Sequence, residues 1–341
     1  MITLNEIRRI IGKSQNPLIF FDDDPDGLIS FLLVRKHFGK GKGVIVKGKP
    51  MLGISYLLSV EKYNPDLIIV LDKPIIEQEF VDKISVPIIW IDHHPVIEIK
   101  GVKYYNPRIR DKKDNRCISY WCYQLTKENL WLATVGCVAD YQIPGFIKKF
   151  KKEYPDLLGD NGDQKEILFN SRLGRLIRIF SLSLKGATFD VNKNIDIISK
   201  ANNPHDLLDG VGDAKFLLNK IEKIEKVYDK LLEQAVNENK KEKIVVFIYP
   251  SQKFSFSAEL SNELLYRLPG RFIVVGREKE GEVKMSLRNP GDKKIKLPEI
   301  INKALIGLQG YGGGHDFAAG ACVRKNDFEQ FISVIKDEIL K

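Results

Sequence analysis

The fold of this chain is decided by residues 86–94, Val-Pro-Ile-Ile-Trp-Ile-Asp-His-His, where an apolar run ends in one acid and two histidines. A continuous apolar run is typical of a strand that is buried on both faces of an α/β sheet. Such a strand would place Asp92, His93 and His94 at the sheet edge where open α/β folds bind ligands. Because imidazoles bind metal ions and pair with anions, this stretch predicts the floor of a metal site.

Two upstream segments repeat the pattern. Residues 18–21 are apolar and run into Asp-Asp-Asp-Pro-Asp-Gly at residues 22–27, and the apolar residues 67–71 end at Asp72. The segments between these strands are long enough for crossover helices, so we expect parallel strands whose carboxyl ends share one edge. Carboxylates gathered at one edge repel one another unless cations lie between them. The acidic cluster therefore predicts bound metal.

A fourth acid follows a helix rather than a strand. Residues 129–141 predict a helix with an apolar stretch at residues 133–139, directly before Asp140. An acid at the end of so apolar a segment is not expected to be merely a surface residue. Asp140 is therefore a further candidate for the cleft. After the acidic loop, residues 28–38 carry apolar side chains at helical spacing, and the N-terminus of that helix would favour anions.

The composition bounds what the cleft could act on. A length of 341 residues suffices for two ordinary domains, and 43% hydrophobic with 29% charged residues indicates a globular chain. A formal charge of +9 and a pI near 9.1 favour a polyanionic partner such as nucleic acid. A solvated lysine-rich surface would explain the same charge.

The cysteines and the hydropathy indicate the compartment. Cys117, Cys122, Cys137 and Cys322 have no C-x-x-C spacing and predict reduced, mostly buried thiols rather than a zinc site or disulfides. Residues 1–13 lack the apolar core of a signal peptide, and no segment approaches the roughly 20 apolar residues of a membrane span. We therefore expect a cytoplasmic protein without a membrane partner.

The second half of the chain predicts a long helix and a second α/β domain. Apolar residues from Leu217 to Ala235 alternate at spacings of four and three, which is a heptad seam. Because the seam is short, a connecting helix packed on its own domain is favoured over a coiled-coil dimer, although a homodimer stays open. We predict a parallel-sheet catalytic domain at residues 1–190, a helical linker at 191–242 and a smaller α/β substrate-binding domain at 243–341.

A glycine-rich loop is predicted within the second domain, where residues 310–315 read Gly-Tyr-Gly-Gly-Gly-His. Three consecutive glycines leave only backbone N–H groups facing outward, a surface that suits a phosphate or a nucleobase. A flexible turn is the alternative. His315 directly after the glycines favours ligand contact.

Together these motifs resemble those of the DHH phosphoesterases, a family named for its Asp-His-His triplet. The resemblance covers nearly the whole chain, and its five motifs occur in the family's order. They are Asp22-x-Asp24-x-Asp26-Gly27, Asp72, Asp92-His93-His94, Asp140 and Gly312-Gly313-Gly314-His315. The first motif, and Asn106-Pro107-Arg108 after the triplet, look more like the RecJ-like single-strand nucleases than the small-substrate pyrophosphatases. The resemblance implies a DHH domain followed by the family's associated C-terminal domain.

The resemblance also implies two divalent ions, and oxygen ligands with an imidazole suit Mn²⁺ well, with Mg²⁺ as the alternative. The implied ligands are Asp22, Asp24 and Asp72 for one ion and Asp26, Asp72, His93 and Asp140 for the other. Asp72 would bridge the ions, Asp23 is expected to be a bystander, and the division of the first-motif aspartates stays open. A water between ions roughly 3.5–4 Å apart would attack phosphorus in line. His94 is implied as a phosphate contact or leaving-group acid, and Asp92 as the group that orients the neighbouring imidazole.

On the second domain, the resemblance implies that Arg288 and His315 grip a phosphate or the terminal nucleotide beside the glycines at 312–314. Arg108 is a further candidate for the same task.

Three functions are compatible with these residues. The favoured one is a metal-dependent exonuclease or oligonucleotidase that cuts single-stranded DNA or RNA to mononucleotides. The net positive charge favours it, because an enzyme that moves along a strand needs a basic groove. The alternative is a small-substrate phosphoesterase acting on dinucleotides, cyclic dinucleotides or nucleotide 3′-phosphates. The third is an inactive scaffold that binds a helicase or replication assembly. Retention of every ligand position argues against the scaffold, although an active nuclease in DNA repair could have the same partner.

Overall fold

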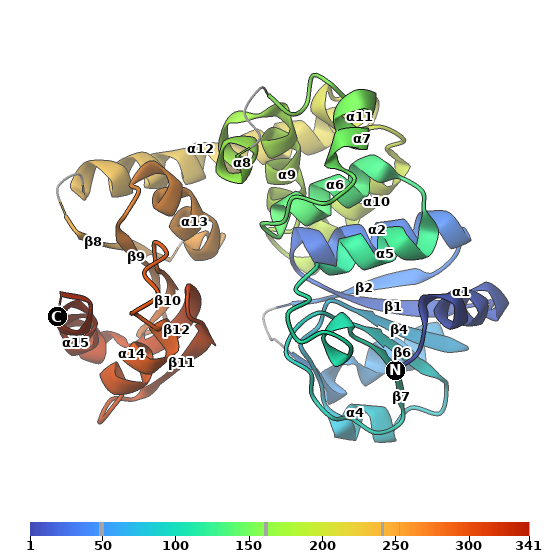
Figure 1. The fold of residues 1–341 in the computed structure, drawn as a ribbon, viewed down its shortest axis with the longest axis horizontal. Helices are drawn as coiled ribbons and strands as arrows, with labels where there is room; N and C mark the ends of the chain where they lie inside the picture. Colours follow the sequence, from blue (N-terminus) through green and yellow to red (C-terminus); the bar gives the residue numbers. More distant parts are fainter. Residues whose placement is uncertain (48–50, 160–162, 240–241, 252, 341) are drawn as a thin grey trace. The chain divides into compact units, whose positions relative to one another are not determined.

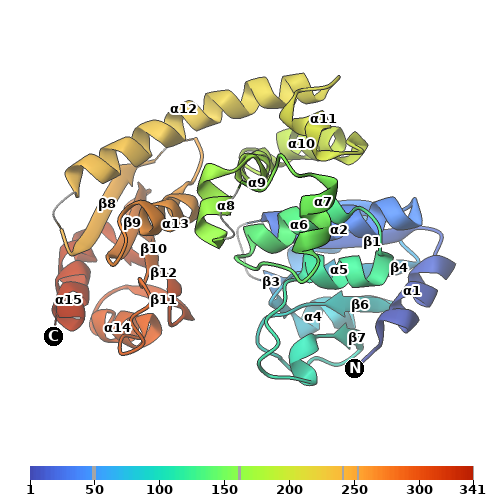
Figure 2. The ribbon, with the colours of Figure 1, turned by 45° about the horizontal axis from the view of Figure 1, so that its top comes forward.

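The computed structural model describes residues 1–47, 51–159, 163–239, 242–251 and 253–340 (Figures 1 and 2). The chain divides into two compact units, Met1–Asn219 and Lys220–Lys341, and the division falls inside helix α12 (Ala214–Glu238). Each unit contains its own five-stranded sheet. The predicted α/β architecture, two sheet domains joined by a long helix, is therefore confirmed. The bounds predicted for the domains stay a prediction.

The first unit is built on a parallel sheet. Its strands lie in the order β2-β1-β4-β6-β7, and every pairing between neighbours is parallel, as the apolar runs predict. The bounds are Lys42–Val46 for β2, Pro17–Asp22 for β1, Leu67–Leu71 for β4, Ile88–Ile91 for β6 and Val102–Tyr105 for β7. The three middle strands are almost entirely buried, which is why they consist of uninterrupted apolar residues.

The register of the three middle strands places their last apolar residues in one row. Phe21 on β1 pairs with Leu71 on β4, and Leu71 pairs with Ile91 on β6. The residues that follow this row are the aspartates of the first three motifs, Asp22, Asp72 and Asp92. These acids therefore emerge side by side at the carboxyl edge of the sheet.

Helices cover this sheet on both faces. The helices of the unit are α1 (Leu4–Lys13), α2 (Pro25–Phe38), α3 (Leu57–Tyr63), α4 (Gln78–Asp82), α5 (Ile118–Thr126), α6 (Leu130–Ala139), α7 (Ile147–Glu153), α8 (Gln164–Asn170), α9 (Arg172–Ser183), α10 (Thr188–Lys200) and α11 (Pro204–Leu208). On one face α2 packs on β1, where the rings of Phe21 and Phe31 stack with centroids 4.7 Å apart, and α5 and α6 pack on α2. On the other face Phe80 of α4 meets Phe20 edge to face.

A short parallel pair, β3 (Met51–Leu52) with β5 (Ile75–Ile76), lies outside the main sheet.

The second unit holds a mixed sheet of order β11-β12-β10-β9-β8. The strands are β8 (Ile244–Pro250), β9 (Phe272–Lys279), β10 (Glu282–Arg288), β11 (Gly310–His315) and β12 (Ala318–Arg324), and the helices that follow α12 are α13 (Ser257–Arg267), α14 (Leu297–Ala304) and α15 (Phe328–Leu340). Only β8 and β9 pair in parallel, and the other pairings are antiparallel. Helices α14 and α15 cover one face through a core that includes Met285, Ile301 and Phe331.

The prediction of a loop at residues 310–315 is wrong, because this segment is the edge strand β11. Gly310 to His315 pair in antiparallel register with Val323 to Ala318 of β12. Packing requires the glycine at position 312, because a Cβ there would lie 2.6 Å from Ile301 Cγ2 on α14. The backbone N–H groups of a glycine-rich segment can therefore also be used for strand pairing.

The heptad seam lies on α12 and is buried. Its residues are Leu217, Ile221, Ile224, Tyr228, Leu231 and Ala235. Because these side chains are covered by the chain itself, they do not form an exposed dimer surface, which agrees with the packed-helix interpretation.

All four cysteines are buried free thiols, as predicted. Among the described residues, every helix falls short of the length or hydropathy that crossing a membrane requires.

Candidate metal centre

The backbone carries the sheet one residue beyond its apolar row. The amide of Asp72 donates to the Ile91 carbonyl at 3.0 Å, and the amide of Asp92 donates to the Tyr105 carbonyl at 3.1 Å. Asp72 then adopts a left-handed conformation with φ of 60°. Aspartate tolerates this region better than most residues, yet the conformation still costs about 1–2 kcal/mol. Such backbone strain is typical of functional positions.

The first motif forms a tight junction between β1 and α2. Asp24 caps α2 by accepting a hydrogen bond from the amide of Gly27 at 2.9 Å, and Pro25 is the first residue of the helix. A Cβ on Gly27 would lie only 2.7 Å from the amide nitrogen of Asp22. The glycine of the motif is thus required for the close approach that brings the three spaced aspartates together.

Asp26 is held by the N-terminus of α5. Its two carboxylate oxygens accept hydrogen bonds from the amides of Ile118 at 2.8 Å and Ser119 at 2.7 Å, where the helix dipole favours a negative charge. A carboxylate has about four lone-pair sites, so these two bonds leave room for a cation. The side chain is buried, with 2% of its surface exposed.

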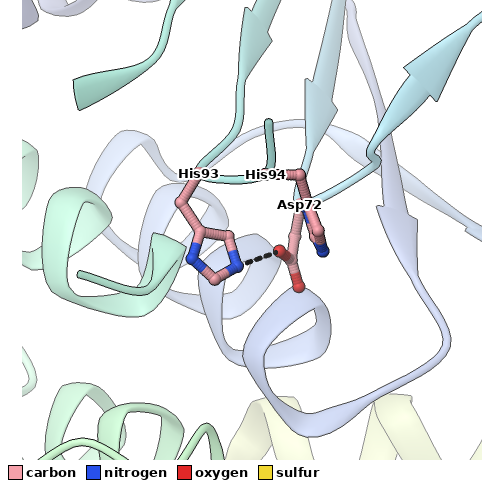
Figure 3. A group of neighbouring side chains, drawn as sticks. All are labelled: Asp72, His93 and His94. Atoms are coloured by element: carbon pink, nitrogen blue, oxygen red, sulfur yellow. Dashed lines mark ion pairs between the residues drawn. The ribbon is translucent and has the colours of Figure 1, made fainter. Parts of the chain in front are cut away.

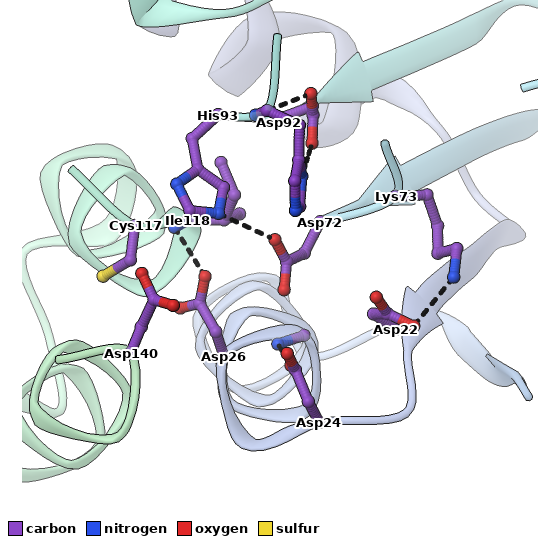
Figure 4. A network of polar contacts seen from close by, with 12 residues as sticks. Asp22, Asp24, Asp26, Asp72, Lys73, Asp92, His93, Cys117, Ile118 and Asp140 are labelled. Atoms are coloured by element: carbon purple, nitrogen blue, oxygen red, sulfur yellow. Dashed lines mark hydrogen bonds and ion pairs between the residues drawn. The ribbon is translucent and has the colours of Figure 1, made fainter. Parts of the chain in front are cut away.

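The acids and imidazoles gather into three groups, in each of which one ligand atom per residue lies within 4.8 Å of the others (Figures 3 and 4). The groups are Asp22-Asp24-Asp72, Asp72-His93-His94 and Asp26-Cys117-Asp140. Asp72 belongs to two of them. The structure therefore brings together every residue that the sequence predicted as a metal ligand, from three strand ends and two helix ends.

Asp72 carries the clearest sign that a cation belongs here. Its side chain is 2% exposed, and within the described part of the chain its Oδ1 has no hydrogen-bond partner. The Nε2 atom of His93 lies 3.4 Å from that oxygen (Figure 3). An unsatisfied buried carboxylate oxygen is costly, and a bound cation removes that cost. The donor set of carboxylates and one imidazole fits Mn²⁺ or Mg²⁺.

The electrostatics agree with this assignment. Burial, reinforced by the neighbouring aspartates, raises the pKa of Asp72 and of Asp140 well above the ordinary range. Asp24 is exposed, yet neighbouring protein atoms still reduce the hydration of its carboxylate. Loss of hydration, together with the charges of Asp22 and Asp26, raises its pKa to about 7. The cluster without metal therefore retains protons near neutral pH, and a divalent cation would displace them.

The two histidines differ in their surroundings. His94 Nδ1 lies 2.7 Å from Asp92 Oδ1, and the buried Asn106 side chain donates to Asp92 Oδ2 at 3.2 Å. Burial alone would lower the pKa of His94, but the hydrogen bond and charge of Asp92 outweigh it and raise that pKa. Burial lowers the pKa of His93, which keeps its imidazole neutral. The residue that Asp92 orients is therefore His94, whose Nε2 is left to face a ligand.

Three residues of the cluster are missed by the sequence motifs. Gln142 donates to Asp140 Oδ2 at 2.9 Å and accepts from the Cys117 amide, also at 2.9 Å. Burial and a hydrogen bond with Cys137 raise the pKa of the Cys117 thiol, so this thiol stays protonated and Asp26 and Asp140 supply the oxygens of their group. The third is Lys73, whose Nζ lies 2.8 Å from Asp22 Oδ1. Neither an apolar run nor a spaced motif marks these positions.

Two other predicted residues lie in the first unit. Arg108 is in the short 3₁₀ helix Pro107–Ile109, where its amide donates to the Asn106 side chain at 2.9 Å. The residue expected to be a bystander, Asp23, is exposed, and it belongs to none of the three groups.

Three of the predicted substrate residues of the second unit, Gly313, His315 and Arg288, share one face of its sheet, whereas Gly312 and Gly314 belong to the other face. Antiparallel pairing sets Gly313 opposite Gly320, and Gly320 opposite Ser286, while His315, Ala318 and Arg288 form the next row. A Cβ on Gly313 would meet nothing within 4 Å, so this face is open there. Tyr311 lies two residues before Gly313 on β11 and therefore on the same face, and 62% of its surface is accessible. The Arg288 guanidinium is oriented by Asn262 of α13, at 2.6 Å.

The comparisons with known proteins concern the fold that carries this cluster. Residues 242–341 match the family model of the DHHA1 domain. No curated protein matches the sequence. RecJ from Thermus thermophilus in complex with Mn²⁺ superposes with a TM-score of 0.67 at 16% identity, over 98% of this chain and 54% of that one, so the chain spans about half the length of that relative.

Two further solved structures match over most of their own length. Exonuclease RecJ bound to manganese gives a TM-score of 0.68 at 16% identity, over 100% of this chain and 95% of that one. The DHH domain of a member of a family of ribosomal proteins gives 0.69 at 14% identity, over 99% of this chain and 89% of that one. At these identities the likeness is one of fold. The matches show a DHHA1 domain at residues 242–341 and a fold shared with RecJ and with DHH-domain proteins. The resemblance that the five motifs indicated is thus confirmed, and the DHHA1 domain is the part of the chain that carries Arg288 and the glycine-rich strand.

Proposed function

We propose that this chain is a DHH-family, metal-dependent phosphodiesterase that removes mononucleotides from single-stranded DNA or RNA. The observation that carries the proposal is the buried, unsatisfied Oδ1 of Asp72, which belongs to two of the three ligand groups. A carboxylate in that position fits between two cations, and a pair of divalent ions is the common catalyst of phosphodiester hydrolysis. Mn²⁺ is the proposed ion and Mg²⁺ the alternative.

The chain's own residues would hold the reacting groups. Asp22, Asp24 and Asp72 would bind one ion, and the other would be bound by Asp26, Asp72, His93 and Asp140. When bound, the ions supply Lewis acidity to the phosphate and make water a stronger nucleophile at neutral pH. The neutral imidazole of His93 is in the state that metal ligation requires.

His94 is proposed as the proton donor. Its raised pKa favours the protonated imidazole, and the Asp92 hydrogen bond at Nδ1 leaves the Nε2 proton for a phosphate oxygen or the departing oxygen. Asp92 is in turn held by Asn106 and by the Tyr104 hydroxyl, 3.4 Å away. This chain of contacts would keep the donor in one orientation.

The net positive charge of the chain and one sheet face of the second unit both favour single-stranded nucleic acid as the substrate. The formal charge of +9 suits a polyanion. On the second unit, the backbone of Gly313 and Gly320 is bare on a sheet face that also carries Arg288, His315 and the exposed Tyr311. Guanidinium and imidazolium groups pair with phosphate, and an exposed phenol offers a flat surface on which a base can stack. We propose this face as the place that binds the terminal nucleotides.

The proposal is tested by following single-stranded DNA and RNA, labelled at either end, with Mn²⁺ or Mg²⁺. Stepwise shortening is expected, and Asp72→Asn should reduce its rate by more than about a hundredfold, because it removes a ligand that a neighbouring acid cannot replace. Asp23→Asn is the matched control, because Asp23 lies in the first motif but outside the three ligand groups, and its rate should stay near that of the natural chain. Hydrolysis confined to dinucleotides would instead support the small-substrate alternative. Intact strands together with tight Mn²⁺ binding would contradict the nuclease proposal.

A further inference from the structure

Lys73 brings a positive charge to the cluster that the five motifs do not contain. Its side chain is 1% exposed, and its Nζ lies 2.8 Å from Asp22 Oδ1 (Figure 4). The backbone of Lys73 is fixed as well, because the buried Trp90 indole donates to its carbonyl at 2.9 Å. A side chain enclosed to this degree can leave Asp22 only if its surroundings repack.

The charge of Lys73 lies next to only one of the proposed cation positions. Asp22 belongs to the group with Asp24 and Asp72, which therefore combines three carboxylates with one ammonium. The group of Asp26 and Asp140 is stabilised differently, by the α5 amides and by Gln142. Among the described residues, no lysine or arginine forms an ion pair with Asp26, Asp72 or Asp140. The two proposed cation positions thus share Asp72 but differ by one unit of resident charge.

We propose that Lys73 makes the two positions unequal, so that one divalent ion binds tightly with Asp26, His93 and Asp140 and the second binds weakly with Asp22 and Asp24. This inference rests on the metal centre of the proposed function. Two like charges a few ångströms apart in a poorly hydrated site repel by more than the 1.4 kcal/mol that corresponds to tenfold in affinity. Salt screens buried charges only weakly, so the difference should persist at physiological ionic strength.

Bound substrate would then strengthen the binding of the second ion. A phosphodiester brings a negative charge to the side of the cluster where Lys73 has neutralised one carboxylate. The second ion should therefore bind more tightly in the presence of a strand than in its absence, by the reciprocity that links two ligands on one protein.

The test is a titration of the full chain with Mn²⁺, in which free Mn²⁺ is counted by electron paramagnetic resonance and heats are measured by calorimetry. The natural chain is expected to bind one ion tightly and a second at least about tenfold more weakly. Lys73→Met keeps the length of the side chain and removes the charge, so the second ion should bind at least about tenfold more tightly than in the natural chain. Lys73→Arg keeps the charge and should keep the inequality. Lys83→Met removes the same charge from an exposed position at the end of α4 and should leave both affinities unchanged.

The outcomes separate this inference from the proposed function. Two ions of equal affinity in the natural chain, or a second affinity that Lys73→Met leaves unchanged, overturns the role of Lys73 while the metal centre stands. A folded natural chain that binds no Mn²⁺ overturns both. Circular dichroism checks the fold of each variant. If Lys73→Met does not fold, Lys73→Gln takes its place, and the ratio of the two affinities in the natural chain still decides.

Discussion

Replacement of Gly27 by alanine should disturb the cluster through the backbone, without touching a ligand. Gly27 lies in the first turn of α2, and an added Cβ would lie 2.7 Å from the nitrogen, 2.8 Å from the carbonyl oxygen and 3.0 Å from the Cα of Asp22. All three are main-chain atoms of β1, which cannot rotate away as a flexible side chain can. We predict that Gly27→Ala pushes α2 away from β1.

The size of the effect follows from the same distances. Carbon atoms in contact prefer a separation of about 3.5 Å or more, so the strand and helix must separate by roughly 0.5–1 Å. Overpacking of this kind costs about 1–3 kcal/mol, and the higher helix propensity of alanine returns up to about 1 kcal/mol. The free energy of unfolding should therefore fall by about 0–3 kcal/mol, with a middle value of about 1.5 kcal/mol. Ligand geometry tolerates shifts of only about 0.5 Å, so we expect the Mn²⁺ affinity to fall by tenfold or more.

Urea unfolding and calorimetric Mn²⁺ titration measure the two effects. Gly12→Ala is the control, because Gly12 lies in helix α1 and a Cβ there would meet nothing within 4 Å. That variant should be as stable as the natural chain or gain up to about 1 kcal/mol. If Gly27→Ala kept both the stability and the Mn²⁺ affinity of the natural chain, the reasoning about the β1–α2 junction would be refuted.

Two further predictions concern protons. Between pH 6.5 and 8 the metal-free chain should lose thermal stability as pH rises, because Asp24, with its pKa raised to about 7, and Asp72 bind more protons in the folded than in the unfolded state there. Thermal unfolding with a chelator should show a falling Tm that Mn²⁺ restores, and a Tm that rises over this window would contradict the assignment. Asp92→Asn should lower the pKa of His94, since the hydrogen bond and charge that raise it are weakened while burial remains. An NMR titration of the His94 ring that did not change would show that Asp92 is not its partner.

The arrangement of the first unit is predictable from sequence because its cause is local. A strand buried on both faces must be apolar along its length, so the end of each apolar run indicates where the chain reaches the sheet edge. Phe21, Leu71 and Ile91 end those runs, and their pairing places the next three aspartates in one row. Asp140 follows the same logic at the end of the buried helix α6. The placement of these acids was predictable, while their role as ligands stays a prediction.

Other features depend on contacts that leave no pattern along the chain. Strand β11 was expected to be a loop because three glycines carry no side-chain periodicity, and only its partner β12 makes it a strand. The pair β3 and β5 is too short for a period-two signal. Lys73 reads as an ordinary residue after a strand, and its pairing with Asp22 depends on the register between β1 and β4. Sequence patterns report what each element buries, whereas these features depend on which elements become neighbours.

The cluster also gives a reason to expect that the proposed metal binding is coupled to folding. Acids with raised pKa values and a left-handed Asp72 make the metal-free site unfavourable, and the buried strands and helices around it must compensate. A cation that binds only the folded cluster stabilises the chain by about 2.7 kcal/mol at a concentration 100 times its dissociation constant. If Lys73 weakens one of two positions, most of that gain should be reached when a single ion is bound. The rise of Tm with Mn²⁺ should then follow occupation of the tight site, while the rate of hydrolysis should follow occupation of the weak one. The midpoint of the Tm curve should therefore lie at a lower Mn²⁺ concentration than the midpoint of the activity curve.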